Sequence, residues 1–113
     1  MSIPSRIKSS AGGHYPLQTR ASAATMYLPP DDNCFLVSGS TTITSLVTDT
    51  WVRNRRVMLI GAASAAVTFT NTNSPTANQM YLQGANLVLN EDDVLELFCK
   101  SDGSWIIVNT TIA

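Results

Sequence analysis

The side chains that could perform acid–base chemistry are few and poorly placed for it. The one histidine, His14, follows Gly12 and Gly13, in a stretch that predicts no regular element to hold it. Nucleophilic catalysis needs a base within hydrogen-bond reach of its nucleophile. The acidic residues 31–32 and 91–93 fall at turn signals, where Asp accepts hydrogen bonds from nearby backbone amides. These patterns favour a protein that is not an enzyme.

Ligand sets for a metal or cofactor are equally weak. Asn90, Asp92 and Asp93 could offer oxygens to Ca²⁺, but their spacing is not that of an EF-hand loop. Cys34 and Cys99 are not spaced as metal ligands; we expect buried thiols, with a disulfide as the alternative. No glycine loop of the phosphate-binding kind occurs. We therefore expect no cofactor and no metal.

A group of arginines, Arg53, Arg55 and Arg56, follows Trp51. Seven basic and eight acidic residues give a net charge of -1, without the broad basic surface of a nucleic-acid binder. We expect these arginines to bind carboxylates of a neighbouring subunit or protein. A mean hydropathy of +0.08 and no long apolar run predict no membrane span. The first residues do not resemble a signal peptide, so we expect assembly in a cytoplasm.

The 113 residues suffice for one domain, and composition divides them into two regions. Residues 1–32 hold four of the five prolines. Residues 1–30 carry three basic residues and no acid, whereas residues 31–113 carry four basic and eight acidic residues. We predict an extended N-terminal arm, 1–32, and a body, 33–113; a merely solvated terminus is the alternative. The side chains with which the arm would contact a partner are Arg6, Ile7, Lys8, Tyr15, Leu17, Arg20, Tyr27 and Leu28.

The body reads as an all-β fold of about eight short strands. Apolar runs, many of them alternating, are separated by turn signals at residues 34–37, 41–47, 56–61, 66–70, 80–84, 86–90, 94–100 and 105–108. Their close spacing is typical of a small β-sandwich or β-barrel-like body. In the run 94–100, Leu95, Leu97 and Cys99 should share one face.

Several of these strands are apolar on both faces, notably 57–60, 80–82 and 105–108. A two-layer body has one interior, so a second apolar face predicts self-association. The alternative is that such residues are tolerated singly at the surface. The expected subunit-interface residues are Trp51, Arg55, Arg56, Met80, Tyr81, Phe98 and Trp105.

Residues 41–109 contain a recurring set of short motifs. These are Ile43, VMLIG at 57–61, TFTN at 68–71, the segment 78–84, LVL at 87–89 and DGSW at 102–105. Together they resemble a module of tailed-phage structural proteins, found in tail-fibre ends and head-decoration proteins. The sequence departs from the family at residues 54–56, where a glycine is common. The resemblance implies a homotrimeric β-structure without enzymatic activity.

Within that family, a lone module behind a short arm resembles a capsid decoration or cement protein. The resemblance therefore implies a homotrimer on the capsid surface of a virion, bound by its arm to the major capsid protein, with no nucleic acid and no membrane as partner. The main alternative is a tail-fibre or head-fibre module that recognises host glycan through loop 71–79 and Tyr81. A small polysaccharide-cleaving enzyme and a cellular carbohydrate-binding module are further alternatives.

Overall fold

The structure, a computed structural model, describes residues 17–113, and this part of the chain is all-β. One 3-10 turn, η1 (Thr50–Val52), accompanies the strands, and no helix here is long and apolar enough to cross a bilayer. The strands are β1 (Gln18–Ala21), β2 (Thr25–Tyr27), β3 (Cys34–Ser38), β4 (Ser45–Val47), β5 (Arg55–Gly61), β6 (Ala66–Phe69), β7 (Met80–Tyr81), β8 (Leu87–Asn90), β9 (Val94–Cys99) and β10 (Trp105–Thr111).

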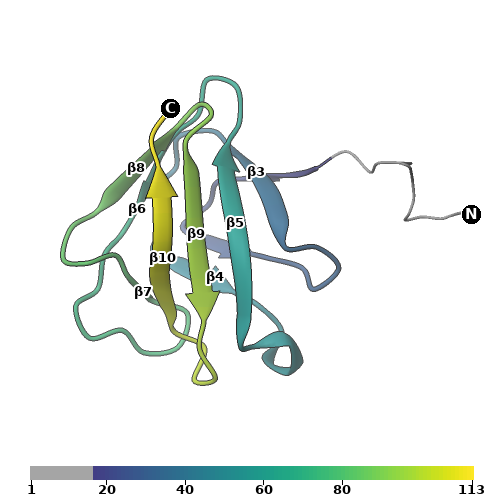
Figure 1. The fold of residues 1–113 in the computed structure, drawn as a ribbon, viewed down its shortest axis with the longest axis vertical. Helices are drawn as coiled ribbons and strands as arrows, with labels where there is room; N and C mark the ends of the chain where they lie inside the picture. The colour runs from purple at the N-terminus through teal and green to yellow at the C-terminus, as the bar shows by residue number, and fades with distance from the viewer. Residues whose placement is uncertain (1–16) are drawn as a thin grey trace, which may run out of the picture.

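One large sheet forms the front layer in Figure 1, in the order β1-β3-β5-β9-β10-β7. Its first three strands run parallel, β5, β9 and β10 are antiparallel, and β7 is parallel to β10. Two small sheets, the parallel pair β2–β4 and the antiparallel pair β6–β8, complete the body. Several neighbouring strands of this sheet are far apart in the sequence, for example β5 and β9, or β7 and β10.

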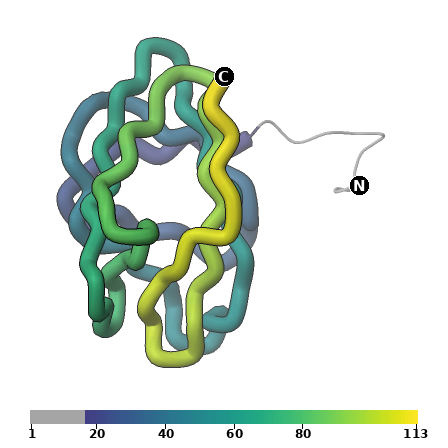
Figure 2. Tube along the Cα trace, turned by 60° about the vertical axis from the view of Figure 1, so that its left-hand side comes forward, coloured from purple at the N-terminus to yellow at the C-terminus, as the bar shows by residue number. Residues whose placement is uncertain are grey.

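Short links join the small sheets to each other and to the large one. An isolated bridge pairs Ile43 with Phe69, and another pairs Asn71 with Met80 beside β7. Leu46 of β4 donates its backbone N–H to the carbonyl of Asn78. Figure 2 shows the chain curving around a common interior. The body is thus a sandwich partly closed into a barrel.

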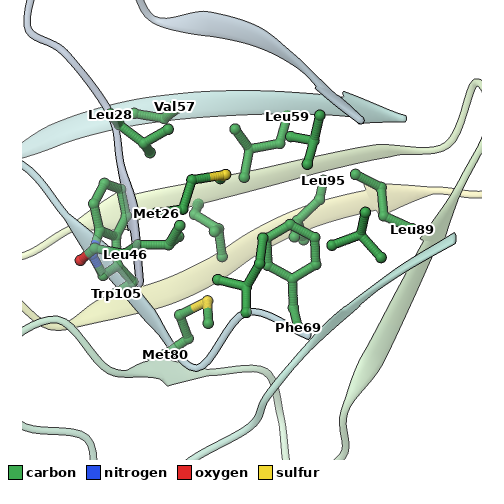
Figure 3. Close-up of a cluster of buried hydrophobic side chains, with 14 of the residues drawn as sticks. Met26, Leu28, Leu46, Val57, Leu59, Phe69, Met80, Leu89, Leu95 and Trp105 are labelled. Atoms are coloured by element: carbon green, nitrogen blue, oxygen red, sulfur yellow. The ribbon is translucent and has the colours of Figure 1, made fainter. Parts of the chain in front are cut away.

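The interior is filled by the alternate side chains of strands from both layers (Figure 3). In β9, Leu95, Leu97 and Cys99 are buried while the intervening residues are half-exposed, which confirms the expected alternation. Trp105 is fully buried, and its indole Nε1 donates a hydrogen bond to the carbonyl of Leu46, 2.9 Å away. This bond satisfies the one polar atom of a large core side chain and ties the two layers together.

The boundary expected between arm and body at residue 32 is wrong. Strands β3–β10 account for the eight expected strands, but β1 and β2 add two more from within the expected arm. β1 pairs with β3, β2 pairs with β4, and Met26 and Leu28 are buried. Residues 29–30, which read as a boundary, form part of the connection between β2 and β3. Strands of three or four residues gain their stability from distant partners, which periodicity does not reveal.

Candidate interaction surfaces

The side of the six-stranded sheet turned away from the core is apolar along most of its width. Pairing registers place Met58 beside Glu96, Phe98 beside Arg56 and Ile106, and Ile106 beside Tyr81, so these side chains share one face. We call this surface the outer face. Its apolar members come from five adjacent strands and are Leu36, Met58, Ile60, Val94, Phe98, Ile106 and Tyr81.

The outer face is exposed in the described part of the chain. Met58 and Ile106 keep 37% and 38% of their surface in contact with water, and Val108, at the bulge of β10, keeps 44%. The remaining members shield one another and are half-buried. Contiguous exposed apolar patches on a small protein mark interaction sites more often than single exposed residues do. The outer face is therefore the leading candidate for a docking surface.

A charged pair lies within this apolar surface. Arg56 Nε and Glu96 Oε2 are 3.5 Å apart, and the arginine side chain is 62% exposed, against 20% for the glutamate. This is the one ion pair among residues 17–113, and exposure limits what it adds to stability, about 0–1 kcal/mol. Its value to an interface would be orientation, because a covering surface must present matching charges at this point.

Arg55, which was expected at a subunit interface, is half-buried and donates its hydrogen bonds within its own chain. Its guanidinium donates hydrogen bonds to Thr48 Oγ1 at 2.9 Å and to the carbonyls of Pro29 and Asp32. Burial lowers the pKa of this guanidinium, and nearby acidic groups oppose that shift. Arg55 therefore ties the connection after β2 to the start of β5. Sequence reasoning expected carboxylate partners, whereas backbone carbonyls within the same chain are used.

One end of the molecule gathers segments that are distant in sequence. The amide of Gln18 donates to Asp31 Oδ1 at 3.1 Å, which joins the start of β1 to the connection that Arg55 holds. Tyr27 donates its hydroxyl to Asp49 Oδ2 at 3.0 Å, and Asp49 directly precedes η1, which carries Trp51. We call this region the Trp51 end. Trp51 therefore lies just before β5 begins, whereas Gln18 is level with Leu59, farther along β5, because Gln18 pairs with Phe35 and Phe35 with Leu59.

The other predicted interface residues divide between core and surface. Met80 and Trp105 are fully buried inside one chain, so they cannot serve as subunit contacts. Arg56, Tyr81 and Phe98 lie on the outer face, as an interface role requires. A period of two separates the faces of a strand but does not say which one is interior. Exposure alone shows that Tyr81, and not Met80, faces outward.

The predicted arm residues also divide. Leu17 and Tyr27 are 40% and 39% exposed, and Arg20 is half-buried. Leu28 is fully buried and belongs to the core, so its expected contact with a partner is wrong. The remaining four, Arg6, Ile7, Lys8 and Tyr15, lie outside the described residues.

The two cysteines are free and lie on opposite faces of the large sheet. Cys34 pairs with Met58 on the outer side, whereas Cys99 pairs with Arg55 on the inner side. Their strands are separated by β5, hence by two strand spacings or about 9–10 Å. A disulfide needs Cα atoms within about 7 Å, so the disulfide alternative does not hold in this fold. Burial is the main reason that the pKa of each thiol is raised.

The loop expected to meet a glycan is held in shape by its own amide side chains. Asn71 Oδ1 accepts backbone N–H groups of Leu82 at 2.7 Å and Gly84 at 3.2 Å. Asn86 Oδ1 in turn accepts the backbone N–H of Asn71. Tyr81 lies in β7 and faces the outer surface beside Ile106. Sequence reasoning identified this segment but missed Asn71 as the residue that organises it.

The carboxylates form no metal centre in the described part of the chain. Asp93 is buried, and its two oxygens accept the backbone N–H groups of Asn90 and Ala113 at 2.9 and 2.8 Å. Between residues 17 and 113, no three His, Cys, Asp or Glu side chains come together as a ligand set. Asp93 therefore acts as a cap that holds the end of β10, and both of its oxygens already accept backbone N–H groups.

Known proteins offer no further guide to these surfaces. No protein-family model, no curated protein and no solved structure matches this chain. The geometry of the outer face and of the Trp51 end is therefore the basis for the function considered next.

Proposed function

We propose that this chain is a non-enzymatic structural protein of a phage virion, a capsid decoration or cement protein that works as a homotrimer. The observation that supports the proposal most is the apolar outer face, which has no cover among residues 17–113. Further copies of the same chain are the simplest source of a matching surface, since closed symmetry gives each copy the same contacts. Arg56 and Glu96 would fix the orientation of the copies.

Attachment to the shell would fall to the segment before β1. Residues 1–16 contain Arg6 and Lys8 and no acid, whereas residues 17–113 contain five basic and eight acidic residues. A basic segment on an acidic body suits an acidic surface on the major capsid protein. Three such segments on one trimer would bind with an avidity above that of one segment. Binding to the assembled shell alone would stabilise that shell by mass action.

Sedimentation with empty heads, purified from a virus that lacks this protein, tests the proposal. Full-length protein should pellet with the heads, and a variant without residues 1–16 should stay in the supernatant while keeping its oligomeric mass. Replacing His14 by alanine in the full chain is the matched control and should leave pelleting unchanged. A full-length protein that does not pellet with heads would contradict the role in the capsid.

A second candidate is a tail-fibre or head-fibre module that recognises host surface glycan. The favouring observation is the hydrogen-bonded loop around Asn71, because a prearranged polar loop loses little entropy on binding. Screening the protein against immobilised bacterial polysaccharides distinguishes the two. Glycan binding that Asn73→Ala abolishes, with no sedimentation on heads, would replace the decoration role by the receptor role.

A further inference from the structure

The barrel is not closed between β8 and β10. β8 pairs with β6 alone, so its second edge has no strand partner among residues 17–113. β10 pairs with β9 along its length, but on its other side β7 reaches only Trp105 and Ile106. Residues 107–111 of β10 therefore have a free edge within the described chain. Figure 2 shows β8, in green, and the second half of β10, in yellow, on either side of this opening.

The two free edges converge at one end and diverge at the other. Asp93 holds the converging end, because its carboxylate accepts the N–H groups of Asn90, the last residue of β8, and of Ala113, just after β10. At the other end the link between the strands is indirect: β8 pairs with β6, Asn71 beyond β6 bridges to β7, and β7 pairs with β10. The opening therefore widens from Asp93 toward β7.

The core is incompletely covered at this place. Leu87 of β8 and Ile107 of β10 pack against the core but are only partly buried. Each pairs with a fully buried residue, Phe69 and Leu97 respectively, so both side chains face inward. We call these two side chains and the two free edges the β8–β10 opening. A strand added here would cover both side chains and remove their apolar area from water.

The free edge of β10 has a backbone donor directed away from β9. The carbonyls of Cys99 and Asp93 accept N–H groups from β5 and the residue before it, so alternate residues of this segment, Leu95 included, bond toward β5. Thr110, the partner of Leu95, accordingly points its N–H outward, where Asn109 Oδ1 accepts it at 2.9 Å. A neighbouring side chain is a partner that an incoming backbone carbonyl can displace.

This edge is suited to strand addition. Residues 107–111 contain neither the lysine nor the proline that commonly blocks an exposed strand edge. The bulge at Val108 and the bond from Asn109 limit accidental pairing without closing the edge. An extended peptide that adds to such an edge gains affinity from main-chain hydrogen bonds and specificity from its alternate side chains.

The charges beside the opening are acidic. Glu91 and Asp92 are exposed next to Asp93, where the two edges converge. Lys100 is the one basic residue in the sequence 81–113, and it follows the opposite end of β9. The chemistry therefore favours an incoming segment with apolar residues at alternate positions and a basic residue at the end beside this turn.

We propose that the β8–β10 opening takes one extended segment of the capsid protein as an added strand on β10. The backbone of the segment pairs with residues 107–111, its apolar side chains cover Leu87 and Ile107, and a basic side chain lies beside Glu91 and Asp92. The inference rests on the proposed function, in which the capsid shell is the partner. It adds to that function a contact made by the body and not by residues 1–16.

Titration of full-length protein against empty heads tests the added strand. Thr110→Pro removes the outward N–H and places a ring on the free edge, a position at which proline is tolerated. Thr110→Ala is the matched control, because both variants lose the hydroxyl bond to the carbonyl of Val94 but only alanine keeps the N–H. Thr110→Pro should bind about tenfold more weakly than Thr110→Ala, since it leaves a carbonyl of the partner without its donor. Equal Tm values would show that both variants fold.

Asp92→Asn gives a second test that leaves β10 unaltered. Asp92 has a φ of 66°, a left-handed conformation that asparagine also adopts, so the turn should be kept. Loss of the carboxylate should weaken binding to heads and make it less sensitive to salt. Asp102→Asn, which removes a charge in the turn before β10 and keeps the oxygen that accepts the N–H of Ser104, is the control and should bind like the unaltered protein.

Hydrogen exchange of backbone amides gives a readout that needs no substitution. The peptide that covers residues 107–111 should exchange more slowly when full-length protein is bound to heads than when it is free.

The outcomes separate this inference from the function on which it rests. If full-length protein does not bind heads, the proposed function fails. If it binds, Thr110→Pro binds like Thr110→Ala and residues 107–111 gain no protection, the added strand is overturned and the decoration role stands. If these residues are already protected in the free oligomer and Thr110→Pro lowers its mass, another copy of the chain occupies the edge, which also overturns the inference.

Discussion

The two faces of the six-stranded sheet are both apolar, yet the chain treats them differently. Leu59, Leu95 and Leu97, on the inner face, are fully covered by the second layer. Met58 and Ile106, on the outer face, have comparable side chains but stay more than one-third exposed. Burial of apolar area within one folded chain accounts for the three inner leucines. Folding of a single copy does not explain the second set, and this difference supports self-association.

The largest effect is expected on the inner side, from Trp105→Ala. The substitution removes the largest fully buried side chain among residues 17–113 and takes away the indole donor to the carbonyl of Leu46. We expect a loss of about 3–5 kcal/mol in the free energy of unfolding, measured by urea denaturation. Phe98→Ala on the outer face, measured at a concentration where the protein is monomeric, should cost far less. Equal losses at the two positions would remove the distinction between the faces.

A smaller loss is expected where the inner side meets β8. A Cβ on Gly61 would stand 1.8 Å from the carbonyl oxygen of Asn90, a backbone atom that cannot move alone. Gly61→Ala should therefore lower the free energy of unfolding by about 1–3 kcal/mol through forced backbone shifts. Ala66→Ser, at an exposed position nearby, is the control and should stay within about 0.5 kcal/mol. An unchanged Tm for Gly61→Ala would show that β5 and β8 are not so closely packed.

Ile106→Lys should change the free energy of unfolding still less, but it should clearly weaken the association of copies. The side chain is 38% exposed, so the folded monomer should lose little stability. A charge buried between copies is costly, so the oligomer should dissociate. Light scattering on the variant and on Val88→Lys, an exposed position outside the large sheet, separates a local effect from a general effect of added charge. Retention of full oligomeric mass by Ile106→Lys would place the subunit interface elsewhere.

The smallest expected difference between the two faces is in the labelling rate of their cysteines. The pKa of both thiols is raised, chiefly by burial, so less thiolate is present at neutral pH and labelling should speed up as the pH rises toward that pKa. Cys34 is half-buried and should react with a maleimide before Cys99, which is fully buried. Mass spectrometry of partly labelled protein identifies the site. Preferential labelling of Cys99 would contradict the assignment of inner and outer faces.

The sequence predicts this fold where local pattern carries the information. The alternation in residues 94–100 correctly separates Leu95 and Leu97 from Phe98, and turn signals delimit the strands of the body. Pairings such as β1 with β3 depend on contacts between distant short segments, which no local pattern encodes. The same limit explains why Leu28 was expected on the surface and is instead buried.

The candidate surfaces could be predicted only in part, because local pattern shows which residues share a strand face but not which face is interior. Doubly apolar strands correctly indicate a second apolar face, but Met80 and Trp105 were assigned to it because periodicity does not say which side is interior. Arg55 was expected to seek a carboxylate outside the chain, although Pro29 and Asp32 supply carbonyls that only the folded chain brings near. Trp51, which was expected at a subunit interface, is exposed in η1, and its role in an interface stays a prediction.

Sedimentation velocity of the full-length protein, from low to high micromolar concentration, tests most directly whether the outer face is a contact between copies. Self-association predicts a species of three times the chain mass of 12.2 kDa that dissociates on dilution and is absent for Ile106→Lys. A single species of one chain mass at the highest concentration would show that the outer face stays in water, and the account of the protein as a self-assembling structural component would be contradicted.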